Sequence, residues 1–85
     1  MAEDLWLKSH QFILNSNVND FYESGGYRNI VVKRTARKIH FSNGDVVTIS
    51  KSKYGFFHLT GKNVNQIIRD IEGYLLLLKH QVFSI

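Results

Sequence analysis

Apolar residues recur at helical spacing toward the C-terminal end of the chain. From Val64 they follow one another at intervals of three and four residues as far as Leu78, which predicts a helix with one apolar stripe. Asn63 is a suitable cap for this helix, and Lys79 and His80 place positive charge where the helix dipole favours it. The stripe consists of Val64, Ile67, Ile68, Ile71, Leu75 and Leu78.

The first 25 residues also predict helical structure. Asp4 can cap a helix over residues 5–14, and Asn17 can cap a short second helical turn. Gly25-Gly26 would end that second turn, because glycine adopts the left-handed conformation that commonly follows a helix. The strands are therefore expected to begin only at Tyr27.

From Tyr27 onward the period changes to two, which predicts four strands. Alternation places Ile30 and Val32 together on one face of the first strand. Asn43-Gly44 favours a two-residue type I′ hairpin with Phe41 opposite Val46, although a longer loop would change this register. The four strands are expected near residues 27–33, 38–42, 46–51 and 56–60.

The order of these elements predicts an α+β fold in a single domain over residues 1–85. Sequential strands joined by tight turns form an antiparallel meander, here of three to four strands. The N- and C-terminal helices would pack on one face of this sheet to bury their apolar stripes. A chain of 85 residues has room for one core and excludes a two-domain cofactor enzyme.

Composition narrows the cellular context. The absence of cysteine excludes a disulfide framework, a zinc knuckle and a thiol nucleophile, and it fits a reducing compartment. The longest purely apolar run, residues 75–78, is far shorter than the roughly 20 residues of a membrane span. The first four residues, MAED, are acidic where a secretory signal would be basic. A cytoplasmic protein without a membrane partner is expected.

Positive charge is concentrated in the middle of the chain. The net charge of the whole chain is +4, but residues 28–62 hold eight basic residues and one acidic residue. Such a segment predicts a face that binds a polyanion, and nucleic acid is the commonest polyanion in the cytoplasm. An acidic patch on another protein is the alternative partner, and a basic surface that only aids solubility is the third interpretation.

The basic residues around Thr35-Ala36 would form the tip of the first predicted hairpin. Arginine at such a tip can bond two phosphate oxygens at once. Aromatic and imidazole rings between the cations would stack on RNA bases, with little sequence specificity. The predicted nucleic-acid-binding residues are Arg28, Lys33, Arg34, Arg37, Lys38, His40, Lys51, Lys53 and Tyr54.

Catalytic chemistry has weaker support in the sequence. His40 and His58 could share one face of the sheet and act as base and acid in metal-free RNA cleavage. However, no acidic residue lies close in sequence to orient either ring, and the acids show no metal-ligand spacing alongside a histidine. We therefore expect a protein that is not an enzyme, with no catalytic residue, no metal and no cofactor.

The predicted C-terminal helix is apolar beyond its stripe, which indicates a second surface that covers it. In so small a protein this surface is often another subunit, so a homodimer is expected. The predicted interface residues are Tyr74, Leu76, Leu77, Val82 and Phe83.

The order helix, three strands, helix resembles that of the double-stranded RNA-binding domain. That family contacts phosphates through a lysine cluster that opens its last helix. Residues 61–66 of this chain offer only Lys62 there, so RNA would be bound through another surface.

The whole chain also resembles small early proteins of tailed phages. The resemblance rests on the length, on the acidic start MAED and on the basic stretch VKRTARK at residues 32–38. It implies an RNA-binding counter-defence protein that inhibits the endoribonuclease toxin of a type III toxin–antitoxin system in the host cytoplasm.

The sequence therefore predicts a non-catalytic RNA-binding protein that uses a basic β-hairpin, with a toxin ribonuclease as its further partner. One alternative is a protein–protein inhibitor whose basic face docks on an acidic partner. The other is a metal-free ribonuclease.

Overall fold

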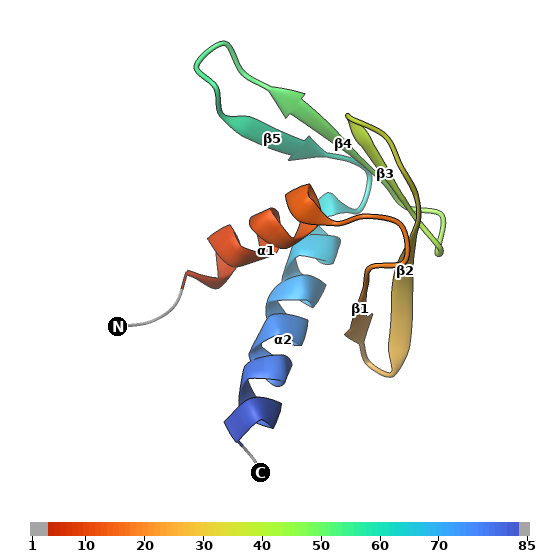
Figure 1. Ribbon diagram of the computed structural model, residues 1–85, viewed down its shortest axis with the longest axis vertical. Coiled ribbons are helices and arrows are strands. Elements are labelled where there is room, and N and C mark those ends of the chain that lie inside the picture. Colours follow the sequence, from red (N-terminus) through yellow and green to blue (C-terminus); the bar gives the residue numbers. More distant parts are fainter. Residues whose placement is uncertain (1–3, 84–85) are drawn as a thin grey trace.

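Two helices flank an antiparallel sheet whose strands follow one another in chain order. The structure, a computed structural model, describes residues 4–83 and the side chains as far as residue 80. The elements are α1 (Leu5–Asn15), β1 (Phe21–Ser24), β2 (Tyr27–Arg34), β3 (Lys38–Phe41), β4 (Val46–Lys51), β5 (Phe57–Thr60) and α2 (Val64–Phe83). Figure 1 shows both helices on the same side of the curled sheet. The predicted α+β class is confirmed, but the sheet has five strands where three to four were expected.

The start of α1 follows the sequence prediction. The carboxylate of Asp4 accepts a hydrogen bond of 2.9 Å from the backbone N–H of Leu7, as a helix cap does. At the other end, the Ser16 hydroxyl donates to the carbonyl of Ile13 at 2.7 Å and satisfies one of the last carbonyls of the helix.

The additional strand is β1, where the sequence predicted a second helical turn. Gly25 and Gly26 have φ values of +58° and +78°, which a two-residue type I′ hairpin requires at both loop positions. Accordingly, Ser24 pairs with Tyr27 and Phe21 pairs with Ile30. The glycine pair thus joins two strands, and the predicted helix end at this position was wrong.

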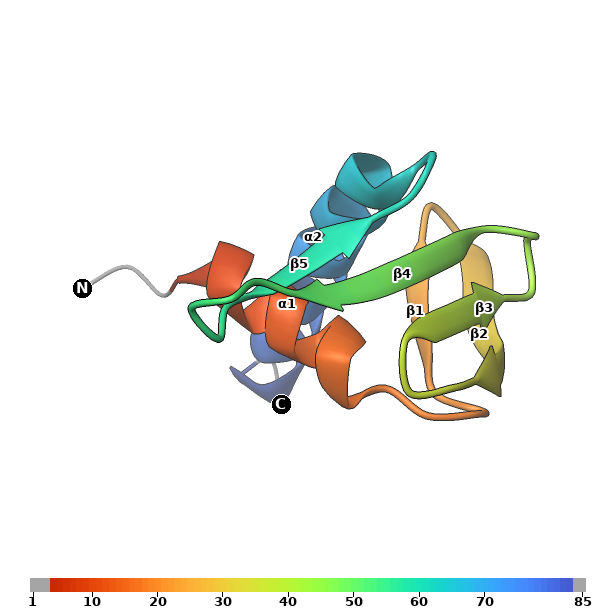
Figure 2. The same cartoon turned by 90° about the horizontal axis from the view of Figure 1, so that it is seen from above.

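Strand β2 faces the core with the opposite set of residues from the predicted one. Asn29 and Val31 are buried, whereas Val32 is 55% exposed. The first part of β2 pairs with β1 and the second part with β3, and a bulge between Val31 and Lys33 interrupts the pairing with β3. Figure 2 shows the β1–β2 hairpin turned away from the direction of β4 and β5.

The β3–β4 hairpin has a longer loop than the favoured prediction. His40 pairs with Val46, so Phe41 does not, and Gly44 alone in this loop has a positive φ, +94°. This register buries Val47 and Ile49. A slip by one residue would turn Val46 and Thr48 to the core in their place.

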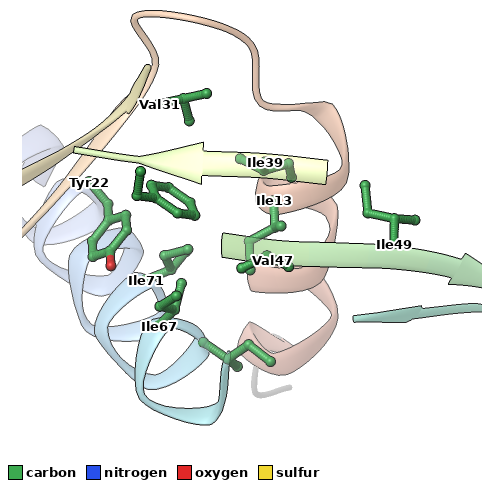
Figure 3. Packing of buried hydrophobic residues seen from close by; sticks show 10 residues of the cluster. Ile13, Tyr22, Val31, Ile39, Val47, Ile49, Ile67 and Ile71 are labelled. Atoms are coloured by element: carbon green, nitrogen blue, oxygen red, sulfur yellow. The ribbon is translucent and has the colours of Figure 1, made fainter. Parts of the chain in front are cut away.

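One continuous core joins the helices to the sheet. Ile13 of α1 meets Ile67 and Ile71 of α2 beneath the central strands, as Figure 3 shows. The α2 stripe is therefore confirmed, although Leu78 at its far end is 39% exposed. Within the described residues, neither helix combines the length and apolarity needed to cross a bilayer.

The burial of Tyr22 makes the stability of this core sensitive to alkaline pH. Burial raises the pKa of its hydroxyl above the ordinary value of 10.0. The folded protein therefore holds this proton more tightly than the unfolded chain does. The resulting contribution to the free energy of unfolding is complete below pH 10 and is lost as the pH rises further. The unfolding free energy measured in urea should fall more steeply above pH 10 in the wild type than in Tyr22→Phe. The exposed Tyr27→Phe serves as control and should keep the wild-type slope; an unchanged slope in Tyr22→Phe would contradict this assignment.

Candidate nucleic-acid interface

The outer face of the sheet, away from the helices, carries part of the predicted basic set. Cross-strand partners share a face, and Lys33 pairs with His40 while Lys38 pairs with Thr48. Their neighbour Ile39 is buried, so the residues on either side of it project outward. The outer face therefore presents two lysines beside the half-buried ring of His40.

The opposite, inner face becomes accessible where the β4–β5 hairpin extends beyond the helices. Ile49 and its partner Leu59 pack against the core, but Lys51 and its partner Phe57, two residues further on, are exposed. The Lys51 ammonium lies 5.8 Å from the centroid of the Phe57 ring. This cross-strand pair thus combines a cation and an aromatic ring on one accessible surface.

The loop between β4 and β5 displays further aromatic rings. The Ser52 hydroxyl accepts hydrogen bonds from the backbone N–H groups of Tyr54 (3.3 Å) and Phe56 (3.2 Å), which stabilise this turn of the loop. Tyr54 is 75% exposed and Phe56 is 68% exposed. The Lys53 ammonium lies 5.2 Å from the centroid of the Tyr54 ring, so cation and ring alternate here too.

The turn between β2 and β3 lies beside this hairpin. Its form is set by Thr35, whose hydroxyl accepts from the N–H of Lys38 at 3.0 Å. The carbonyl of Arg37 accepts from the N–H of Ile49 at 2.7 Å and thereby ties the turn to β4. Figure 1 shows this turn and the β4–β5 loop at the same end of the sheet.

Arg37, Lys51 and Phe57 line one open hollow of about 360 Å³ between the two loops. Among the described residues, no acidic side chain pairs with the lysines or with Arg37 in this region. We call this surface the basic–aromatic end, and it comprises Arg37, Lys51, Lys53, Tyr54, Phe56 and Phe57. Its positive charges and exposed rings are groups that suit the binding of a ligand with negative charge and a flat face.

Arg34 does not belong to this surface, contrary to the sequence prediction. Its half-buried guanidinium donates to the carbonyl of Leu14 at 3.0 Å and to that of Ile13 at 3.5 Å. These carbonyls lie at the C-terminal end of α1, where the backbone lacks helical partners and the dipole is negative. Arg34 therefore fastens α1 to the sheet.

Replacing Arg34 by alanine should consequently affect folding more than binding. The loss of two hydrogen bonds from a charged donor is expected to lower the unfolding free energy by about 1–2 kcal/mol. Thermal unfolding followed by circular dichroism measures this change, with the exposed Lys33→Ala as control. Equal stability of the two variants would show that the guanidinium is not used for the fold.

Arg28 is also separated from the basic–aromatic end. It lies in the β1–β2 hairpin, near the opposite end of β2 from Thr35. Its guanidinium lies 3.8 Å from the carboxylate of Glu23 and 4.2 Å from the centroid of the Phe21 ring. The strand therefore carries Arg28 away from the turn at Thr35, and the structure does not bring it together with the other predicted phosphate-binding residues.

The two histidines of the ribonuclease alternative share the outer face but are not brought together. His40 of β3 pairs with Val46 of β4, whereas His58 of β5 pairs with Ser50, which lies further along β4. Strand spacing places their Cα atoms roughly 16 Å apart, so the register does not bring the two rings to one phosphodiester. Within the described part of the chain, no three acidic or histidine side chains could hold a metal ion together.

The predicted dimer residues divide between the protein's own core and its surface. Tyr74 is half-buried, and its ring packs against Phe12 and Phe21 with centroids 6.3 and 6.4 Å apart, so it contributes to the fold of the protein itself. Leu76 and Leu77 are 42% and 59% exposed, as an interface requires. The side chains of the other two predicted residues, Val82 and Phe83, lie outside the described ones.

A larger hollow, of about 580 Å³, lies elsewhere on the molecule. It opens between α1 and β1 and is lined mainly by polar residues of α1 and the following loop, with Phe12, Phe21 and Leu75. Its mixed polar wall includes both Lys8 and Asp20, so it carries no dominant charge. Size alone does not make it a better site than the basic–aromatic end.

Phe56 and Phe57 of the basic–aromatic end are not among the residues that the sequence predicted to bind nucleic acid. Both were placed at the start of a strand, where apolar side chains are ordinarily buried. The available signal was their position directly after the turn residues Ser52 and Gly55 and beside Lys51 and Lys53. No protein-family model matches the chain, and comparisons with curated proteins and with solved structures likewise find no match.

Proposed function

We propose that this protein is a non-catalytic RNA-binding protein that acts in the cytoplasm through its basic–aromatic end. The observation that carries the proposal is the shared hollow of Arg37, Lys51 and Phe57, which come from two separate hairpins. Cations without acidic partners suit phosphates, and exposed rings suit bases. A surface that only aids solubility would not need three exposed aromatic residues.

Fluorescence anisotropy with a labelled single-stranded RNA and a matched DNA tests this proposal. Three phosphate contacts, one for each cation of the basic–aromatic end, would give an affinity loss of about 20-fold between 50 and 200 mM salt. We expect this loss, together with a preference for RNA. Failure to bind RNA at 50 mM salt would overturn the proposal and favour the docking of the basic face on an acidic protein.

The resemblance to small early phage proteins supplies a second partner, an endoribonuclease toxin of a type III toxin–antitoxin system. Under this proposal the protein inhibits the toxin as a counter-defence factor, with RNA held between the two. Copurification with such a toxin should be lost after nuclease treatment and in Arg37→Gln with Lys51→Gln. A complex that survives both changes would instead support direct protein–protein inhibition.

We also propose that α2 mediates a homodimer, because Leu76 and Leu77 expose apolar side chains on the helix. Light scattering should give twice the mass of one 9.9 kDa chain, and Leu76→Lys with Leu77→Lys should reduce it to that of one chain. Val32→Lys, which changes an exposed apolar residue of the sheet, should leave the dimer intact. A wild-type mass of one chain would rule the dimer out.

A further inference from the structure

The hollow between the β2–β3 turn and the β4–β5 hairpin has an apolar interior and a basic rim. Ile49, only 7% exposed, and Ala36 line it together with the ring of Phe57. Arg37 and Lys51 contribute the charge. A ligand that fits must therefore present a flat or apolar group next to negative charge.

Phe57 is unusual among the strand residues because its ring is 54% exposed although its neighbour Leu59 packs on the core. The helices cover the inner face of the sheet as far as the Ile49–Leu59 pair and leave the Lys51–Phe57 pair uncovered. An exposed phenyl ring has no hydrogen-bonding group, so it gains stability only when another apolar or π surface covers it.

We infer that this hollow binds an unpaired base of single-stranded RNA, stacked on Phe57, while Arg37 and Lys51 hold the adjacent phosphates. This inference rests on the proposed RNA binding and specifies the form of RNA that is bound. A duplex keeps its base faces stacked on one another and offers phosphates without a free base face, whereas a single strand offers both groups that the hollow requires.

The neighbouring loop is suited to receive the next bases of the strand. Tyr54 and Phe56 are exposed there, and the hydrogen bonds to Ser52 hold their backbone before any ligand arrives. Ordering the loop in advance lowers the entropy lost on binding. Since stacking on a ring tolerates any base, the site is expected to bind single strands with little sequence preference.

The test compares a uridine-rich RNA with the same strand carrying abasic sites, which keeps the phosphates and removes the bases. The wild type should bind the strand with bases about tenfold more tightly than the abasic strand. Phe57→Ala should lose most of that difference, keeping only what Tyr54 and Phe56 contribute, and should bind the abasic strand like the wild type. Phe57→Trp should retain the difference, and Tyr27→Ala, which removes an exposed ring at the other end of the sheet, should also retain it.

Two results would overturn the inference in distinguishable ways. If the wild type binds both strands equally, or if Phe57→Ala weakens both equally, the base does not stack on Phe57 while RNA binding through phosphates stands. If the wild type binds neither strand at 50 mM salt, the proposed function fails together with the inference. Circular dichroism spectra of the variants confirm that each compared protein is folded.

Discussion

Replacing Arg37 and Lys51 together by glutamine is expected to lower the affinity for single-stranded RNA about 25-fold near 100 mM salt. Each lost phosphate contact removes about 0.7 from the slope of log affinity against log salt, so the slope should fall by about 1.4. Both side chains are exposed and lack acidic partners among the described residues, so folding should be unaffected. Anisotropy titrations at several salt concentrations measure both quantities.

The matched control is Lys62→Gln with Arg69→Gln, which removes the same charge elsewhere on the molecule. Lys62 and Arg69 are exposed near the start of α2, which follows β5 at the end of the sheet away from Lys51. This pair should change the slope much less than the change in the hollow does. Equal losses in the two double variants would show that RNA responds only to overall charge, and the assignment of the basic–aromatic end would fail.

Replacing Asn29 by alanine is expected to cause the largest loss of stability among polar substitutions. Asn29 is fully buried, and its amide donates to the Tyr22 hydroxyl at 2.8 Å. Its carbonyl oxygen accepts from the Ser42 hydroxyl and from the N–H of Asn43, both at 3.2 Å. Alanine would leave buried polar groups without partners, at a cost of about 2–4 kcal/mol, which corresponds to a fall in Tm of roughly 10–25 °C.

Asn65→Ala on the exposed surface of α2 is the control for Asn29→Ala, and it should change Tm little. Adding Tyr22→Phe to Asn29→Ala should cost less than the sum of the two single changes, because the hydroxyl that lost its partner is then removed as well. Additive losses, or an Asn29→Ala variant as stable as the control, would contradict the role given to this buried network.

The elements that could be predicted from the sequence are those whose pattern of residues lies within one short stretch of the chain. The stripe of α2 and the Asp4 cap of α1 are local patterns, and both are present in the structure. Strand β1 was missed because it has four residues, and because a glycine pair can equally end a helix or form a hairpin loop. The inward face of β2 was reversed because it buries Asn29, whose partners are distant in sequence.

The sequence predicted that the candidate site would be basic, but it did not show which of the basic residues belong to the site. The charge of residues 28–62 indicated a basic surface, yet the chain alone could not show that Arg34 turns inward to α1 while Arg37, three residues later, lines the hollow. That difference follows from the bulge in β2 and from the turn at Thr35. Phe57 was assigned to a strand, and its exposure depends on where the helices stop covering the sheet, which no local pattern encodes.

Titration of the isotope-labelled protein with a single-stranded RNA, followed by amide chemical shifts in NMR spectra, tests the location of the RNA site most directly. Shift changes should be confined to residues 35–38 and 51–58, and they should weaken as salt is raised. Changes centred on the β1–β2 hairpin or on the first turns of α2, with the basic–aromatic end unaffected, would contradict the assignment of the RNA site.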